Sequence, residues 1–543
     1  MTTTTGTPPS PHRSAHSELL SPVEIVAVTA RGDRKLSHTD MLNWSAGSIR
    51  VSLVDTSDSL AIDIEAPGES LASLIIRWRH PSHFLLLGDH WERSYGDLHW
   101  EPENPDRIMP WYFMANSGAV THGAGVKTGG NSFAAWNLCD GVLKLVLDTR
   151  CGGSGVQLGA RTLRAAEIVV LKGDGSESPF QATQRFCSMM CPKPRLPKAP
   201  VYGINDWYFA YGAITREVIL DHAEMLAPLA VGNANKPFCV IDAGWAKRAP
   251  GKETISCWAD YYDTPHDSFG DMTQVAGDLR KLGYRPALWT RPLCASHTDN
   301  PNLLVPHIPR VEALGYPILD PTIPENLERI KHNLHTYRQW GYEMVKHDFS
   351  TVDLFGKWGF QMITDRDMTF PGWHFHDQSL TNAEVVLQLY QALRDAAGDE
   401  LLLLGCNTIS HLSAGLFEVQ RIGDDTSGQE WARTRKMGVN TLGFRAPQHN
   451  RFYAADGDCV GLTPAVPWAK NKQWMQLLAE SGTPLFISAQ KEAVGQEQRA
   501  FMKECFTLAA RDLPVGEPLD WQETPFPRKW KLNGKTVDFN WDE

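Results

Sequence analysis

Residues 23–195 alternate hydrophobic and polar positions with the two-residue period of half-buried β-strands. In the segments 49–53, 60–64 and 74–78 every second side chain is apolar, so each strand would bury one face and expose the other. Clusters of Gly, Pro, Asn and Asp separate these segments, and a helical pattern longer than two turns first occurs at 180–190. The pattern predicts an N-terminal antiparallel β-sandwich domain.

A Pro-rich linker at 192–200 precedes a different pattern, in which short apolar runs alternate with amphipathic helical segments up to residue 512. Eight of these runs are strand candidates. They lie at 201–207, 238–241, 285–290, 342–347, 401–406, 419–423, near Asp458 and at 484–488. Eight βα units predict a (β/α)8 TIM barrel over 196–512. A doubly wound sheet is the rival fold, but no glycine-rich phosphate loop follows the first strand.

The two ends of the chain carry little pattern. Residues 1–22 are rich in Thr, Ser and Pro, and we expect them to form a disordered lead-in. They lack a basic segment followed by an apolar one, so no Sec-type signal peptide is visible and a cytoplasmic location is expected. Ten cysteines without a CxxC pair fit a reducing compartment. Residues 513–543 are long enough only for a short C-terminal β-type tail.

Composition narrows the classes of partner. The 543 residues include 42% hydrophobic and 10% aromatic residues, which is typical of a folded globular protein, and the net charge is −11. That acidic balance argues against nucleic acid or an anionic membrane as the main partner, and no apolar run approaches the roughly 20 residues of a membrane span. Burial in the core is the first explanation of the 19 tryptophans, but indole rings also stack on sugar faces, which fits a carbohydrate partner. An oligomer is possible.

In a barrel of this kind the active site lies at the carboxyl ends of the strands. The candidate residues there are four carboxylates, two tryptophans, an arginine and an amide, a mixture that suits a sugar. They are Trp207, Asp242, Trp289, Arg291, Asp348, Asn407, Asp425 and Asp458. Any one of these Asp residues could be only the N-cap of the following helix, but four together favour a site.

The fourth strand carries the candidate nucleophile. In Val345-Lys346-His347-Asp348, Lys346 and Asp348 share one face of the strand, so an ammonium group would lie near a carboxylate at the barrel mouth. The positive charge would favour the ionised Asp that a nucleophile requires.

The sixth strand carries the candidate partner. Positions Arg421, Gly423 and Asp425 share one face, and we expect the glycine to leave room for a ligand. This alternation makes Asp425 the inward residue and gives Asp424 a capping or structural position. A β-bulge in the strand would instead turn Asp424 inward. Asp425 and Asp348 would then supply the pair of carboxyl groups that a glycosidase uses.

These segments resemble a known family. WGYEMVKHDFS (340–350) resembles the KWD-type nucleophile strand of the clan D glycoside hydrolases, the α-galactosidase group of families 27 and 36. EVQRIGDDT (418–426) resembles their acid/base strand, in which an Arg stands four residues before the catalytic Asp. VIDAGW (240–245) resembles their DDGW motif, RPALWTRPL (285–293) their third strand and YGDLHW (95–100) an N-terminal segment of family 36. The motifs keep their order from about residue 80 to about 490, and the large N-terminal β module favours family 36.

The resemblance implies a retaining α-glycosidase that acts on terminal α-galactoside-like residues without a metal or other cofactor. By the resemblance Asp348 is the nucleophile and Asp425 the acid/base. Residues matching positions that hold sugar hydroxyls are Lys346, Arg421 and Asp242, with Trp207, Asn407 and Asp458 as weaker matches. The substrate would be an α-linked oligosaccharide or glycoside, and retention also allows transglycosylation, as in the raffinose and stachyose synthases.

Two positions depart from the motifs. DDGW has become Asp242-Ala243-Gly244-Trp245, and the loss of one carboxylate hydrogen bond, roughly 1.5–3 kcal/mol, is enough to change which sugar binds best. The tryptophan of KWD is His347, which faces away from Asp348 by strand alternation.

Three other functions stay open from the sequence. One is a transglycosylase, or a glycosidase for a different galactose-like sugar. Another is a metal-dependent barrel hydrolase that uses His374 and His376. The third is a carbohydrate-binding protein without catalysis, against which the presence of both carboxylates weighs.

Overall fold

A computed structural model describes residues 17–248, 259, 261–296, 299–306, 317–363 and 368–542. Residues 1–16 of the expected lead-in lie outside the described residues. Residues 17–20, at the end of the expected lead-in, are ordered and form the 3-10 helix η1 (Ser17–Leu20). Leu19 is buried, and the Trp78 indole donates to the Leu19 carbonyl oxygen at 2.8 Å. None of the described helices is long and apolar enough to cross a bilayer.

The N-terminal module consists of two antiparallel sheets, which confirms the predicted sandwich. The first sheet has the order β10 (Met109–Pro110), β13 (Phe133–Cys139), β14 (Val142–Asp148), β7 (Ser70–Arg79), β1 (Glu24–Thr29) and β2 (Gly32–Lys35), with β15 (Val156–Gln157) also on β7. The second has the order β3 (Ser37–His38), β4 (Asn43–Ala46), β5 (Ile49–Asp55), β6 (Leu60–Glu65), β16 (Leu163–Leu171), β12 (Thr121–Val126), β11 (Tyr112–Asn116), β8 (Leu85–Gly88) and β9 (Glu101–Pro102). In β5 the apolar residues at 49, 51 and 53 are buried, as their alternation predicts.

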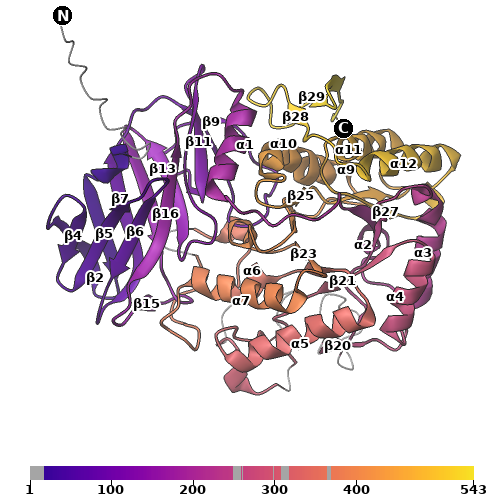
Figure 1. Cartoon of the computed structure of the whole chain (residues 1–543), viewed down its shortest axis with the longest axis horizontal. Helices are drawn as coiled ribbons and strands as arrows, with labels where there is room; N and C mark the ends of the chain where they lie inside the picture. The colour runs from indigo at the N-terminus through magenta and orange to yellow at the C-terminus, as the bar shows by residue number, and fades with distance from the viewer. Residues whose placement is uncertain are drawn as a thin grey trace, which may run out of the picture.

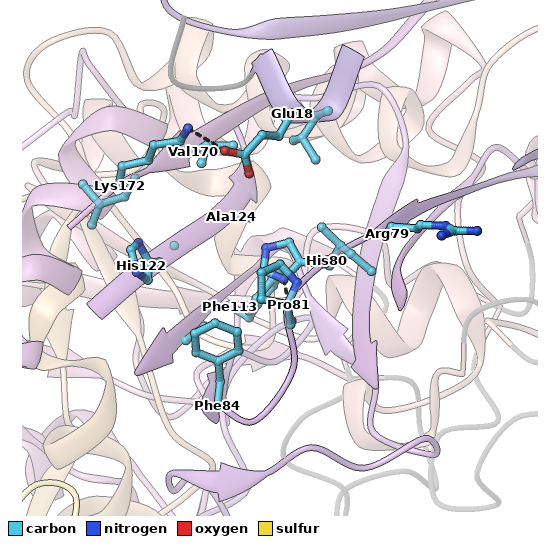
Figure 2. A pocket seen from close by; sticks show the side chains of 15 residues that line it. Glu18, Arg79, His80, Pro81, Phe84, Phe113, His122, Ala124, Val170 and Lys172 are labelled. Carbon is cyan, nitrogen blue, oxygen red and sulfur yellow. Dashed lines mark hydrogen bonds and ion pairs between the residues drawn. The ribbon is translucent and has the colours of Figure 1, made fainter. Parts of the chain in front are cut away.

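A cavity of about 220 Å³ lies beside η1 in the N-terminal module (Figure 2). At its edge Phe84 lies between His80 and His122, with ring centroids 6.0 and 6.4 Å away. Lys172 donates to the Glu18 carboxylate at 3.0 Å on the same rim. Of the described residues that line this cavity, none is a predicted catalytic or sugar-binding residue, so the candidate site lies elsewhere.

The second module is a ring of parallel strands, which confirms the (β/α)8 barrel. Its strands are β17 (Tyr202–Asn205), β18 (Phe238–Ile241), β21 (Arg285–Thr290), β22 (Met344–His347), β23 (Leu402–Gly405), β24 (Val419–Arg421), β25 (Ala454–Asp456), β26 (Cys459–Leu462) and β27 (Leu485–Ala489). β25 pairs with β24, and β26 pairs with β27. These two strands are therefore halves of a seventh strand, interrupted where Asp458 takes a positive φ of 75°, and they close the ring of eight strand positions.

Amphipathic helices cover the outside of the barrel (Figure 1). They are α3 (Arg216–Leu226), α4 (Met272–Lys281), α5 (Pro324–Trp340), α7 (Asn382–Ala397), α11 (Trp468–Glu480) and α12 (Gln496–Ala509). The helix α3 begins where the Thr215 hydroxyl accepts a hydrogen bond from the Val218 N–H. The sixth unit differs, because α9 (Trp431–Thr434), a π-helical segment (Arg435–Asn440) and α10 (Thr441–Arg445) replace a single helix.

Apolar side chains from all parts of the ring fill the barrel interior. They include Phe238, Val240, Ala287, Met344, Leu404, Cys406, Val419, Ala454, Cys459 and Phe486. Because side chains alternate along a strand, the positions two residues beyond Val240, Ala287 and Met344 also face the inside, at the carboxyl ends of the strands. On the fifth strand the inward residue at that end is Cys406, so the predicted Asn407 belongs to the opposite face.

The two modules are joined through buried contacts. The carboxylate of Asp89, in the N-terminal module, is 2.6 Å from the Arg445 guanidinium, and both side chains are almost fully buried. The helix α1 (Pro179–Met190) ends the N-terminal module, and Ser178 at its N-cap donates to Glu517 at 2.7 Å. Glu517 begins a three-stranded antiparallel sheet of β28 (Glu517–Pro518), β29 (Lys529–Leu532) and β30 (Lys535–Asp538), which confirms the predicted β-type tail.

His347 is the outward residue of β22 and is fully buried. Its ring centroid lies 5.7 Å from Tyr390 on α7 and 5.8 Å from Phe417. Among the described residues neither ring nitrogen has a hydrogen-bond partner. Burial lowers the pKa of His347 to about 3, so the imidazole is neutral in the folded protein at neutral pH.

We expect His347→Phe to raise the free energy of unfolding by about 1–2 kcal/mol at pH 8, because an unsatisfied buried polar group is removed. This gain in the free energy of unfolding should grow below pH 6.5. There the unfolded parent binds a proton at His347, whereas the folded parent does not bind one until about pH 3, so the parent loses up to about 1.4 kcal/mol of stability per pH unit relative to the variant. Urea titrations at pH 8 and pH 5 measure both effects. The same change at the exposed His335 of α5 is the control, and a variant less stable than the parent at both pH values would contradict the expectation.

Candidate active site

A cavity of about 100 Å³ lies at the carboxyl ends of the barrel strands. Six of the ten predicted site residues line it. The full lining consists of Arg93, Trp207, Asp242, Ala243, Trp289, Lys346, Asp348, Phe349, Trp358 and Asp425. The cavity therefore combines three carboxylates, two cationic side chains and four aromatic side chains, whereas the predicted barrel mouth has four carboxylates, two tryptophans, an arginine and an amide.

Asp348 follows β22 and is held by three N–H donors. The Trp289 indole donates to Oδ2 at 3.0 Å, while the backbone N–H groups of Phe349 and Asn407 donate to Oδ1 at 2.8 and 3.1 Å. These donors fix the orientation of the carboxylate. Within the described residues Oδ2 accepts one hydrogen bond only, so it keeps a lone pair for a ligand.

Asp242 and Lys346 form an ion pair on the wall beside Asp348. Lys346 Nζ lies 2.7 Å from Asp242 Oδ2, which also accepts from the Asn205 amide at 2.8 Å. Burial alone would lower the pKa of Lys346, but the Asp242 carboxylate raises it well above its usual range, so the ammonium group stays charged. The predicted shared face of Lys346 and Asp348 is present, although the ammonium group donates to Asp242.

Asp206 adds a second carboxyl group next to Asp242 that sequence reasoning missed. Its oxygens accept from the backbone N–H of Asp242 at 3.1 and 3.3 Å, and its side chain is buried. Burial and the neighbouring Asp242 charge raise the pKa of Asp206 well above its usual range, which favours the protonated form. Its position directly after the first strand could have identified it.

Asp425 lies beyond β24 and is more exposed, at 37%. The Arg421 guanidinium donates to its Oδ1 at 3.0 Å. Burial raises the pKa of Asp425, but Arg421 and Arg93 lower it more, so it ends below its usual range. Arg421 also forms an ion pair with Asp458. Arg421 and Asp458 are therefore behind Asp425 and outside the lining, where they orient its carboxylate.

The neighbouring Asp424 is directed elsewhere. Arg93 and Arg433 each approach one of its oxygens at 2.9 Å, and it is not among the lining residues. The expectation that Gly423 leaves room for a ligand is wrong: a Cβ at this position would collide with the carbonyl oxygen of Met437 in the π-helical segment. The glycine instead permits the close approach of that segment.

Besides Arg421 and Asp458, two further predicted residues are outside the cavity lining. Arg291 is fully buried, donates to Asp353 at 2.6 Å and lies 4.6 Å from the ring centroid of Phe349, so it supports that lining residue from behind. Asn407 offers Asp348 its backbone N–H only. The preceding residue, Cys406, belongs to the apolar cluster inside the barrel.

Arg93 comes from the N-terminal module and was not predicted from the sequence. The segment that carries it adds to the end of β24, because Ser94 N–H donates to the Ile422 carbonyl at 2.7 Å and Asp424 N–H donates to the Ser94 carbonyl at 2.8 Å. This pairing brings the Arg93 guanidinium to 3.6 Å from the Asp425 carboxylate. The N-terminal module is thus part of the cavity wall.

The alternative metal site finds no support in the described part of the chain. No group of three or more His, Cys, Asp or Glu side chains there is arranged to hold a metal ion. His374 Nδ1 contacts the Phe375 carbonyl at 2.8 Å, and the backbone at His374 packs closely on Gly152 of the N-terminal module. The expected lack of a metal cofactor stays a prediction.

No protein-family model matches the sequence, but solved structures resemble the chain along most of its length. An α-galactosidase from Thermus thermophilus in complex with p-nitrophenyl α-D-galactopyranoside is 16% identical, with a TM-score of 0.60 over 95% of this chain and 98% of that one. An α-galactosidase from Lactobacillus brevis gives 14% identity and a TM-score of 0.61 over 94% and 76% of the two chains. A family 36 α-galactosidase variant from Geobacillus stearothermophilus in complex with stachyose gives 12% and 0.59 over 93% and 78%. At these identities the likeness establishes the fold.

Proposed function

We propose that this protein is a retaining α-glycosidase that removes terminal α-galactose-like residues. The observation that carries the proposal is the position of Asp348 and Asp425 in the lining of one cavity, next to the Asp242–Lys346 ion pair. Solved proteins of the same fold include α-galactosidases in complex with an aryl α-galactoside and with stachyose, which supports the substrate class.

The first step forms a covalent intermediate. Oδ2 of Asp348, which keeps a lone pair, attacks C1 of the sugar while the bond from C1 to the leaving oxygen breaks. Protonated Asp425 transfers its proton to that oxygen, so the products are a β-glycosyl ester of Asp348, a neutral alcohol and an ionised Asp425.

The second step reverses the roles. Ionised Asp425 takes a proton from a water molecule whose oxygen attacks C1 from the face that the alcohol has left. The ester bond breaks, Asp348 returns as a carboxylate and Asp425 is protonated again. Two inversions release the sugar as its α anomer. An alcohol in place of water would give transglycosylation by the same step.

The wall next to Asp348 binds the sugar. Asp242 and Lys346 present opposite charges to its hydroxyl groups, and charged partners make the stronger hydrogen bonds. Ala243 contributes a methyl group beside Asp242, and Asp206 lies outside the lining. This wall therefore has one carboxylate, which favours as a second candidate a galactose-like sugar altered at C6.

Nitrophenol release from a panel of aryl glycosides tests the proposal. We expect fast cleavage of the α-D-galactoside and much slower cleavage of the α-D-glucoside, α-N-acetylgalactosaminide and α-D-xyloside. The β-L-arabinopyranoside corresponds to the α-D-galactoside without C6. Preference for it would mean that the wall formed by Asp242, Ala243 and Lys346 selects a sugar that lacks C6. An enzyme that leaves every member intact would contradict the proposal.

A further inference from the structure

Two segments form a continuous rim on one side of the cavity. They are residues 91–95 of the N-terminal module and residues 358–362, which follow the helix after β22. The Trp91 indole donates to the Met362 carbonyl at 3.0 Å. At the other end of the rim the ring of Tyr95 meets that of Phe360 edge to face, with centroids 4.7 Å apart. The two segments thus touch along their length.

Glu92 ties the middle of the rim together. Its Oε1 accepts a hydrogen bond from the Gly359 N–H at 2.9 Å and another from the Tyr95 hydroxyl. A Cβ at position 359 would collide with the Glu92 side chain, so the glycine permits this close contact. The side chain of Glu92 is fully buried. The rim is therefore a packed wall, and its inward side chains are held in place.

Arg93 and Trp358 are the rim residues that line the cavity. The Arg93 guanidinium lies 5.5 Å from the Trp358 ring centroid, a cation–π distance, and 3.6 Å from the Asp425 carboxylate. Phe349 contacts the same indole with centroids 6.1 Å apart. Trp358 is only partly buried, so its ring remains available to a ligand beside Asp425.

The order of the barrel strands defines two sides of the cavity. Asp242 follows β18 and Asp425 follows β24, and these strands are four places apart in the ring of eight positions. The two carboxylates therefore approach from opposite sides, with Asp348 after β22 between them. If the sugar lies against Asp242 with C1 at Asp348, its leaving group must extend toward Asp425 and the rim.

We propose that Arg93 and Trp358 form a subsite for the leaving group, which takes a ring-shaped group, either a sugar or an aryl ring, against the Trp358 indole. The proposal rests on the proposed function. The flat indole supplies the contact face, because rings stack on aromatic side chains. Arg93 contacts both the Trp358 indole and the Asp425 carboxylate, so one side chain orients the proton donor and the ring that contacts the leaving group.

Trp358→Ala tests this subsite with two substrates that carry the same sugar. For nitrophenyl α-galactoside, whose leaving group is a ring, kcat/KM should fall about tenfold or more. For α-galactosyl fluoride, whose leaving group is a single atom, kcat/KM should stay within about twofold of the parent, which also shows that the variant folds. Trp358→Phe keeps a ring and should recover part of the loss. Phe360→Ala is the matched control, because this side chain is exposed. Its kcat/KM for both substrates should equal that of the parent.

Two other outcomes for Trp358→Ala would contradict the proposed subsite. Equal loss on the two substrates would mean that Trp358 acts on the fold or on the sugar, and no loss on either would mean that it does not contact the leaving group. A parent enzyme that cleaves neither substrate would overturn the proposed function itself, which separates that failure from failure of the subsite alone.

Discussion

Asp348→Ala should abolish turnover, with kcat/KM for nitrophenyl α-galactoside reduced by about 10⁴-fold or more, because the attacking oxygen is lost. In the structure this carboxylate lies in the cavity lining and is held by the Trp289 indole and two backbone N–H groups. No neighbouring carboxylate among the described residues shares those donors. Nitrophenol release over hours measures the residual rate.

Asp348→Asn separates chemistry from stability. The amide oxygen still accepts a hydrogen bond from one of the donors, so Asn should unfold closer to the parental temperature than Ala does. Both variants should be inactive, since an amide is a poor nucleophile. An Asn variant that keeps a tenth of the parental activity would contradict the nucleophile assignment.

Asp425→Ala should lower kcat/KM by about 10²–10⁴-fold for an oligosaccharide substrate, whose leaving oxygen needs a proton. For α-galactosyl fluoride the loss should be small, because fluoride leaves without protonation. Arg421 and Arg93 lower the pKa of Asp425 in the free enzyme, so only a small fraction of Asp425 is protonated at pH 7, and this fraction increases as the pH falls. The parental kcat/KM for the oligosaccharide should therefore rise from pH 7 toward pH 5, and in the variant this rise should be absent.

Asp424→Ala is the matched control for Asp425. The residue is adjacent in sequence and shares the Arg93 partner, but it lies outside the cavity lining. It should retain most of the activity on the fluoride and on the oligosaccharide alike. A pattern in which Asp424→Ala shows the dependence on the leaving group, and Asp425→Ala does not, would reverse the two roles.

The barrel and part of the site could be predicted because their signals are local. β18 and β21 have the predicted bounds of 238–241 and 285–290, since each contains a short apolar run with clear ends. Strand alternation alone brings Lys346 and Asp348 to the inside and leaves His347 outside. The seventh strand gave the weakest signal, and the structure shows the reason: it is broken at Asp458.

The rest of the site depends on contacts between distant parts of the chain. Arg93 reaches Asp425 only because Ser94 pairs with the end of β24, and no periodicity in the sequence encodes that pairing. The prediction that Gly423 leaves room for a ligand fails because a π-helical segment packs on this residue. That segment lies further along the chain, so the sequence of the strand does not indicate the contact. The role of Asn407 stays a prediction, since the residue donates its backbone N–H to Asp348 but is outside the cavity lining.

The most direct test of the central claim, that Asp348 forms a covalent bond to an α-linked sugar, is the rescue of Asp348→Ala by azide. The cavity left by the side chain admits the small anion on the face opposite the leaving group, and the variant cannot form the ester. We expect turnover of nitrophenyl α-galactoside to return with added azide, and NMR of the product to show β-galactosyl azide. An α-galactosyl azide, or rescue of Asp425→Ala to the β product with none for Asp348→Ala, would contradict the account.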